Sequence, residues 1–452
     1  MDAPAFVPGD ALPAAPALAA RGPRPVGVTT LALSHPQQID VLGSLAAGEP
    51  LRATRTLSAE VWYPSVHDGR TSYLDHLPPS AQDATSAPRS FRFAGRAARD
   101  AEPDRTLGPA PLVVVSHGYP GSRVLLSWLG ENLASKGYAV LALDHTDSTH
   151  ADLADVLSSL RNRPLDIALA LRVAADLERH HPLLHHVWDA DRAALVGFSM
   201  GGYGALLALG AGYDGAALAH PAFEQPLWRE LLDDLTLGQP FYDDLVDGVT
   251  ARVRCAVLLS PWGGAQVWTD AALARLRTPL FVAAGSEDDV ALYPGIRRIF
   301  EGATSVDRWL LTFEHARHNV GCNPPPEALL TAAHESWWRY ADPVWDTRRI
   351  VSVLQHHLTA FLGSCLRGQP LDDYLEGALT APAGEPWPGY PPRSTVGLRL
   401  ERLRGARAAD QPPDEDDVVR DLTAATWAGL SQAWRAHRAR GESARGGSAG
   451  GV

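Results

Sequence analysis

Cysteine is scarce in this sequence of 452 residues, which contains only three. Cys255, Cys322 and Cys365 lie far apart, and their number is odd. This pattern indicates neither a disulfide framework nor a thiolate metal site. We therefore expect reduced thiols in a cytoplasmic protein.

A net positive charge and long apolar runs are lacking as well. The formal net charge is −12 at pH 7 and the sequence pI is about 5.8, so the protein as a whole repels a phosphate backbone and we expect no nucleic-acid partner. Lys136 is the only lysine among many arginines, which we attribute to genomic codon bias and not to anion binding. No window approaches the roughly 18 apolar residues of a membrane-spanning helix, so no membrane span is expected.

The first 24 residues lack the features of a signal peptide. They have no basic n-region, and Pro13 and Pro16 interrupt their apolar run. A signal peptide needs an uninterrupted apolar stretch of about 7 to 15 residues behind positive charge. The Ala- and Pro-rich composition of residues 1–24 instead predicts a disordered leader.

Motifs for cofactors and metals are also missing. No P-loop is present, and we predict no cofactor. Histidine pairs at 180–181 and 185–186 bracket a short turn, but no carboxylate or cysteine accompanies them at ligand spacing, so we predict no metal site. Trp337, Trp338 and Trp345 are interpreted as core packing around the last helices.

What the sequence does contain is a long alternation of strand-like and helix-like segments. The predicted strands cover residues 27–33, 57–63, 111–118, 139–145, the run before Ser199, 255–261, 279–285 and 308–313, and predicted helices include 122–136, 165–179 and 345–366. This alternation predicts an α/β fold with a mostly parallel central sheet of about eight strands and helices on both faces. Ligands in such sheets bind beyond the carboxyl ends of the strands. The polar stretch 65–106 is predicted to be a loop.

Two segments depart from the alternation. Residues 212–254 carry aromatic residues among many acids and are interpreted as an insertion, either a lid that walls the acyl pocket or a packed surface excursion. Residues 376–442 are predicted to form a C-terminal extension with a helix, because acids near 413–417 and arginines toward 440 suit a helix dipole. Residues 443–452 are predicted to be a disordered tail.

The clearest chemical motif lies at residues 197–201, which spell GFSMG and match GxSxG. An apolar run precedes the motif and small residues follow it. In this context the serine sits on a sharp turn from strand to helix with its hydroxyl exposed, and the glycines remove Cβ atoms that would collide with the neighbouring strand and helix. Ser199 is therefore the candidate nucleophile.

A serine nucleophile needs a base and a group that orients the base. In an open α/β sheet these follow in the order acid, then histidine. Asp288 follows the predicted strand 279–285 and is the candidate acid, with Asp289 as the alternative. His318 lies past the last predicted strand and is a better candidate base than His315.

The tetrahedral intermediate of acyl transfer also needs two backbone N–H donors. We assign one to Met200, the residue after the nucleophile, and the other to Tyr119, because Gly118 lets the chain come close to the serine. His117 is expected to orient this loop by hydrogen bonding, and Asp144 and His145 could do so from the adjacent strand end.

Several blocks carry a family resemblance. The segments VVVSHGYPGSR, GYAVLALDHTDST, LVGFSMGG, AAGSEDDV, LLTFEHARHN and VWDTRRIVSVLQHHLTAFL together resemble the α/β-hydrolase superfamily, in particular its predicted dienelactone hydrolases and platelet-activating-factor acetylhydrolase-like esterases. The resemblance implies an α/β-hydrolase domain over residues 25–375 that hydrolyses carboxylic esters through an acyl-serine, without a metal. Ser199 stands where dienelactone hydrolases carry cysteine, so a lactone is not inferred as the substrate.

The sequence therefore predicts a serine esterase whose partner is a small-molecule ester with a small or medium acyl group. Two alternatives stay open at this point. The same triad could serve an acyltransferase or a thioesterase, or the fold could be a non-catalytic binding protein.

Overall fold

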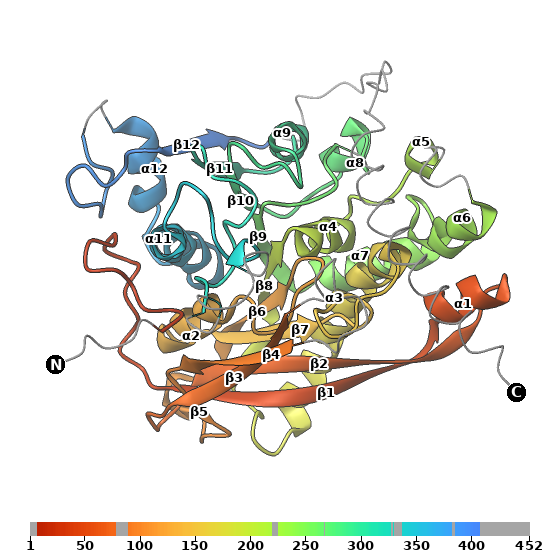
Figure 1. Ribbon diagram of the computed structural model, residues 1–452, viewed down its shortest axis with the longest axis horizontal. Helices are drawn as coiled ribbons and strands as arrows, with labels where there is room; N and C mark the ends of the chain where they lie inside the picture. Colours follow the sequence, from red (N-terminus) through yellow and green to blue (C-terminus); the bar gives the residue numbers. More distant parts are fainter. Residues whose placement is uncertain are drawn as a thin grey trace, which may run out of the picture.

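The computed structural model describes residues 7–77, 89–218, 225–265, 267–326, 329, 337–381 and 385–406. The strands of its large sheet are β1 (Val26–Ile39), β2 (Arg52–Pro64), β5 (Ala97–Arg99), β6 (Ala110–Ser116), β7 (Ala139–Asp144), β8 (Trp188–Phe198), β9 (Val253–Leu259), β10 (Leu280–Gly285), β11 (Arg308–Phe313) and β12 (Leu398–Leu403). They lie in the order β12-β11-β10-β9-β8-β6-β7-β2-β1-β5 (Figure 1). The strands from β11 to β7 run parallel, while β2 and β12 pair antiparallel at either side of this run.

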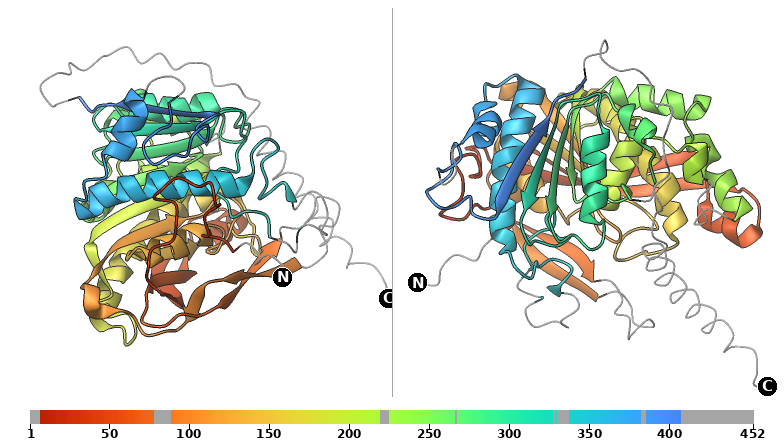
Figure 2. Two further views of the ribbon diagram at one scale, coloured as in Figure 1. Left: turned by 90° about the vertical axis from the view of Figure 1, so that its left-hand side faces the viewer. Right: turned by 90° about the horizontal axis from the view of Figure 1, so that it is seen from above.

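Helices cover both faces of this sheet (Figure 2). They are α1 (Val41–Ala47), α2 (Ser127–Ser135), α3 (Val156–His180), α4 (Met200–Ala208), α5 (Gly215–Leu218), α6 (Pro226–Leu232), α7 (Pro240–Thr250), α8 (Asp270–Ala274), α9 (Tyr293–Gly302), α11 (Thr347–Arg367) and α12 (Asp373–Thr380). Side chains of β6 alternate between two cores: Leu112 and Val114 pack with α3 and α4, and Val113 and Val115 pack with α2 and α11. An apolar run buried on both faces is what a central parallel strand requires.

The predicted α/β architecture is confirmed, and the sheet is larger than predicted. All eight predicted strands are present, and β5 and β12 bring the sheet to ten. The segment 65–106 is not the predicted loop, because it contains the hairpin of β3 (Thr71–Leu77) and β4 (Arg89–Gly95). Tyr73 and Phe91 turn inward there, so the hairpin has an apolar face that its polar composition conceals.

The prediction of a disordered leader over residues 1–24 is wrong for residues 7–24, and residues 1–6 lie outside the described part. Val7 and Ala19 are buried, and the carbonyl of Gly9 accepts hydrogen bonds from Asn132 of α2 at 3.3 Å and Gln355 of α11 at 2.9 Å. Turns within this segment use the carbonyls of Val7, Leu12 and Pro16, whereas the carbonyls of Gly9, Leu18 and Ala19 accept no backbone N–H of the segment. Those carbonyls supply the acceptors that polar side chains of the two helices need.

The described residues of the insertion 212–254 do not wall the cavity beside Ser199. Its described elements are α5, α6, α7 and a 3₁₀ turn at Asp233–Leu235. Helices α6 and α7 pack on α3, and α7 also packs on α4, and none of the described residues of the insertion lines that cavity. Trp228 and Tyr242 are buried in the core on this face of the sheet. The alternative interpretation, a packed surface excursion, fits the described residues.

The domain boundary predicted at residue 375 falls inside α12. Helix α12 packs on β12, which extends the sheet beside β11, so residues 376–381 and 385–406 belong to the fold. The helix predicted near 413–440 and the tail 443–452 lie outside the described residues. Within the described part, no helix combines the length and apolarity needed to cross a membrane.

Candidate active site

Ser199 occupies a strained turn between the end of β8 and the start of α4. Its φ of 53° and ψ of −116° lie outside the regions that L-residues favour. A Cβ on Gly197 would lie 2.4 Å from the carbonyl oxygen of Gly201, and one on Gly201 would lie 2.0 Å from that of Ser116. The glycines of the motif are therefore required by the close approach of β8, α4 and β6.

His318 lies between Ser199 and Asp288 at the carboxyl ends of the strands. Its Nε2 is 2.9 Å from Ser199 Oγ, and its Nδ1 is 2.8 and 3.0 Å from the two carboxylate oxygens of Asp288. Asp288 follows β10 and His318 follows β11, while the ring of Phe198 packs against the imidazole at a centroid distance of 5.3 Å. The structure thus brings the predicted nucleophile, base and acid into one hydrogen-bonded chain.

Asp288 is built to stay ionised. Burial acts to raise the pKa of its carboxyl, but His318 and the backbone N–H groups of Val290 and Ala291 hold that pKa below its usual range. Those two N–H groups donate to its Oδ1 at 3.0 and 2.8 Å. A buried carboxylate fixed in this way can hold the imidazole by its Nδ1–H and stabilise the imidazolium.

The alternative residues are not part of this chain of hydrogen bonds. Asp289 forms an exposed ion pair with Arg317 and does not contact His318. His315 is 75% exposed and lies 3.8 Å from Glu287. The geometry separates both from the chain of hydrogen bonds that reaches Ser199.

The two predicted oxyanion donors flank the nucleophile. Met200 is the first residue of α4, so its N–H is one of the unpaired donors of a helix N-terminus. A Cβ on Gly118 would lie 3.4 Å from Ser199 Cβ, which puts the Gly118–Tyr119 peptide beside the serine. Among the described residues, neither of these N–H groups has a protein acceptor. Both are free to bind a developing oxyanion.

A cavity of about 370 Å³ opens at Ser199 and His318. Sequence reasoning missed most of its wall, which comes from loops after the base and after β7. The added lining residues include His150, Cys322, Trp338 and Pro343. Trp338 is 42% exposed, so its interpretation as core packing is wrong. No spacing rule could have found these residues, because loops that are distant in sequence bring them together.

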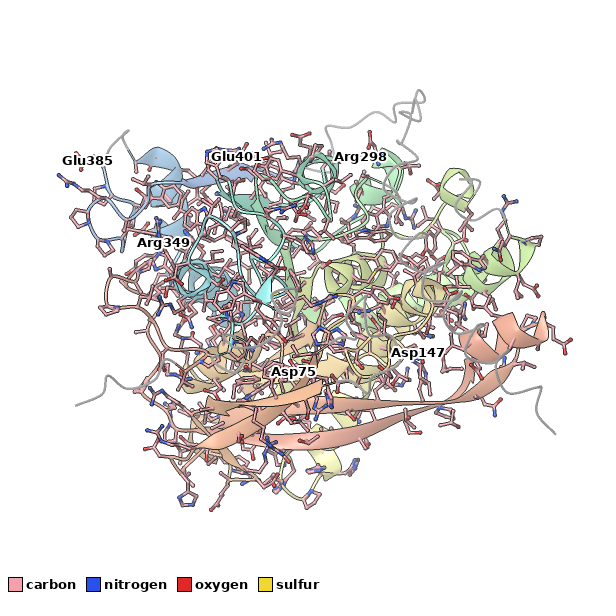
Figure 3. All side chains as sticks on the ribbon, in the orientation of Figure 1. Asp75, Asp147, Arg298, Arg349, Glu385 and Glu401 are labelled. Carbon is pink, nitrogen blue, oxygen red and sulfur yellow. The ribbon has the colours of Figure 1, made fainter. Side chains whose placement is uncertain are left out.

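His150 is a buried polar residue of this wall. It is 4% exposed, and its Nδ1 lies 3.7 Å from Oδ1 of Asp75 on β3, which is labelled in Figure 3. Tyr340 donates to the other oxygen of Asp75 at 3.3 Å. The unpredicted hairpin therefore reaches the back of the cavity wall.

The histidines near the oxyanion loop have structural contacts. His117 donates from Nδ1 to the Gly118 carbonyl at 2.6 Å and accepts the N–H of His145 at Nε2, 3.1 Å away. His145 bonds Ser116 at 2.8 Å and Asp166 at 2.9 Å. Asp144 accepts from the N–H of Arg123 at 2.5 Å. His117 thus holds the loop as expected.

In the described part of the chain, neither a metal site nor a dinucleotide-binding loop is formed. Within the described ranges no group of three His, Cys, Asp or Glu side chains could hold a metal ion. The glycines at 210, 212 and 215 have the spacing GxGxxG, but they follow helix α4 and not a strand. A dinucleotide fingerprint requires a strand before it.

The fold is a mostly parallel α/β sheet that carries a serine, a histidine and an aspartate at three strand ends. A solved structure with a similar fold is the ferulic acid esterase from Streptomyces cinnamoneus, with a TM-score of 0.52 and 20% sequence identity. The comparison covers 85% of this chain and 98% of that one. The likeness supports the predicted fold class.

Sequence comparisons narrow the relationship for part of the chain. Residues 97–220 match the family model described as PET hydrolase-like. Cutinase est2 from Thermobifida alba is 36% identical over 94 residues, which are 21% of this chain and 28% of that protein. Cutinase cut1 from Thermobifida fusca is 34% identical over 94 residues, again 21% of this chain and 26% of the relative. The chain thus spans little more than a quarter of the length of these relatives.

Proposed function

We propose that this protein is a serine hydrolase that cleaves carboxylic esters of small or medium acyl groups through an acyl-serine. The observation that carries the proposal is the unbroken chain of hydrogen bonds from Asp288 through His318 to Ser199. A binding protein has no physical need for all three groups. The names of the relatives, cutinase and ferulic acid esterase, support ester hydrolysis.

The first half of the proposed reaction forms the acyl-enzyme. Ser199 Oγ attacks the ester carbonyl while Nε2 of His318 takes the hydroxyl proton. The carbonyl oxygen becomes an oxyanion and is bound by the N–H groups of Tyr119 and Met200. When the intermediate collapses, the C–O bond to the alcohol breaks and His318 returns the proton to the leaving oxygen.

The second half restores the enzyme. A water molecule attacks the acyl carbonyl, gives its proton to His318 and forms a second tetrahedral intermediate. Collapse releases the carboxylic acid, and the proton passes from His318 to Ser199. Asp288 keeps its negative charge throughout and holds the imidazole with Nδ1 protonated.

The size of the cavity supports the substrate range. About 370 Å³ of space beside Ser199 lies at the lower end of the volumes typical of small-molecule sites, roughly 300 to 1,000 Å³. Pro120, Leu125, Phe198 and Cys322 give it an apolar lining next to the nucleophile, which suits an acyl chain.

A panel of p-nitrophenyl esters with acyl chains of two to twelve carbons tests the proposal. We expect Ser199-dependent hydrolysis that is fastest for the shorter chains, and Ser199→Ala should abolish it. Ser364→Ala is a matched control, because it makes the same substitution away from the active site. Ser364 lies in the last turn of α11, and the end of this helix contacts the loop at the amino end of β7, whereas Ser199 lies at the carboxyl ends of the strands. Turnover that survives in Ser199→Ala contradicts the proposal. Product analysis with added alcohol, amine or thioester separates hydrolysis from acyl transfer and thioesterase activity.

A further inference from the structure

Arg163 is a fully buried cation beneath the oxyanion loop. Its guanidinium donates from Nη2 to the carbonyl of Gly118 at 2.8 Å and from Nη1 to the carbonyl of His117. Among the described residues no carboxylate lies within ion-pair distance of it. Burial lowers the pKa of Arg163 to about 9, so the group is still charged at neutral pH. A buried charge without a paired anion is costly and indicates a function for this residue.

The local sequence fixes Arg163 beside the helix of the nucleophile. A Cβ on Gly204 of α4 would lie 2.7 Å from Arg163 Cβ, so glycine allows α3 and α4 to approach at this position. The next residue, Pro164, has no N–H and leaves the carbonyl of Leu160 without its helical partner. That carbonyl accepts the hydroxyl of Tyr203 at 2.7 Å, which ties α3 to α4.

The contacts of Arg163 set the direction of the Tyr119 N–H. The carbonyl of Gly118 and the N–H of Tyr119 belong to one peptide group, and in a trans peptide they point in opposite directions. Arg163 and Nδ1 of His117 both donate to that carbonyl, at 2.8 and 2.6 Å. These two hydrogen bonds fix the peptide plane and thereby hold the Tyr119 N–H next to Ser199. A cation at the carbonyl oxygen also polarises the peptide and makes its N–H a stronger donor.

We propose that Arg163 is a positioning residue for the oxyanion hole, which holds and polarises the Gly118–Tyr119 peptide so that its N–H meets the developing oxyanion. This inference rests on the proposed ester hydrolysis. Because the interaction strengthens as charge appears on the substrate oxygen, Arg163 acts on the transition state more than on substrate binding. Its loss is expected to lower kcat with little change in KM.

The test compares Arg163→Met and Arg163→Lys with Arg161→Met. Arg161 lies on the same helix and is also buried, but it pairs with Asp234 at 2.6 and 2.7 Å. We expect kcat on p-nitrophenyl butyrate to fall about 30- to 100-fold in Arg163→Met, with KM within about threefold. This loss is smaller than the 10²- to 10³-fold loss of kcat that follows removal of an oxyanion-hole donor. Arg163→Lys should recover part of the loss. Arg161→Met should lower the Tm and keep kcat within about threefold of wild type.

A second measurement reports on the oxyanion itself. A trifluoromethyl ketone with a butyl chain forms a charged tetrahedral adduct, and its Ki should rise across the Arg163 variants by the factor by which kcat/KM falls. The corresponding secondary alcohol should bind all variants alike. Thermal unfolding identifies the folded variants, and Arg163→Lys decides the case if Arg163→Met does not fold.

The two proposals fail in different ways. Wild-type protein without Ser199-dependent ester hydrolysis overturns both. An active wild type whose Arg163 variants keep kcat within about threefold, or lose no more than Arg161→Met, overturns the positioning role alone.

Discussion

Asp288→Asn should inactivate the site by changing the tautomer of His318. The Oδ1 atom of Asp288 accepts two backbone N–H groups, from Val290 and Ala291. In the asparagine variant only the amide oxygen can occupy that position, so the NH₂ group is forced to the place of Oδ2, 2.8 Å from Nδ1 of His318. It then donates to Nδ1 and leaves the imidazole proton on Nε2, which can no longer accept the proton of Ser199.

The loss should be about 10⁴-fold in kcat, the size seen when a triad aspartate becomes asparagine. This corresponds to about 5 kcal/mol of transition-state stabilisation. Initial rates on p-nitrophenyl butyrate at pH 8, with KM measured separately, provide the assay. The geometry changes little, so KM should stay within about threefold.

Asp289→Asn is the matched control, since it removes the neighbouring carboxylate. Asp289 and Arg317 are 48% and 53% exposed in their side chains, and such an exposed pair contributes at most about 1 kcal/mol to stability. We expect kcat within about threefold of wild type. A loss below tenfold in Asp288→Asn, or a larger loss in Asp289→Asn, would refute the assignment of the acid.

Two further predictions concern stability. Gly201→Ala places a Cβ 2.0 Å from the carbonyl oxygen of Ser116 and should lower the unfolding free energy by about 3 kcal/mol or more. Gly248→Ala in α7 adds a Cβ that would meet nothing within 4 Å, so this variant should be stabilised by about 0.5 to 1 kcal/mol. Equal urea midpoints of the two variants would contradict this prediction. Burial lowers the pKa of His356 to about 3, below its value of about 6.5 in the unfolded chain. Between these two pH values the unfolded state therefore binds more protons than the folded state. The stability of the fold falls as the pH drops through that range. The unfolding free energy should therefore decrease by about 2 kcal/mol between pH 7 and pH 5 because of this residue, and His356→Phe should reduce the pH dependence by that amount; an unchanged slope would contradict it.

The central sheet could be predicted because its strands are buried on both faces. Runs such as Leu112 to Val115 are apolar at every position, and that signal needs no tertiary context. The hairpin β3–β4 could not be recognised in the same way, since only alternate residues such as Tyr73 and Phe91 face inward. The packing of residues 7–24 was also hidden, because their backbone carbonyls and not their side chains make many of the contacts.

The candidate site also has residues that the sequence could predict and residues that it could not. Ser199, Asp288 and His318 follow the strands β8, β10 and β11, so chain order and strand ends were enough to make them candidates. Asp288 could not be separated from Asp289 by sequence, because the choice depends on which side chain turns inward to His318. His150 and Trp338 of the cavity wall come from loops, and Arg163 beneath the oxyanion loop comes from helix α3. Only the tertiary structure shows that these segments approach the serine.

Labelling with a fluorophosphonate followed by peptide mass mapping tests the central claim most directly. A fluorophosphonate reacts with a serine only when a base activates its hydroxyl and donors stabilise the charged phosphoryl oxygen. We predict one adduct, on the peptide that contains Ser199, and its absence in Ser199→Ala and strong reduction in Asp288→Asn. Folded protein that forms no adduct, or forms it at another serine, would contradict the account.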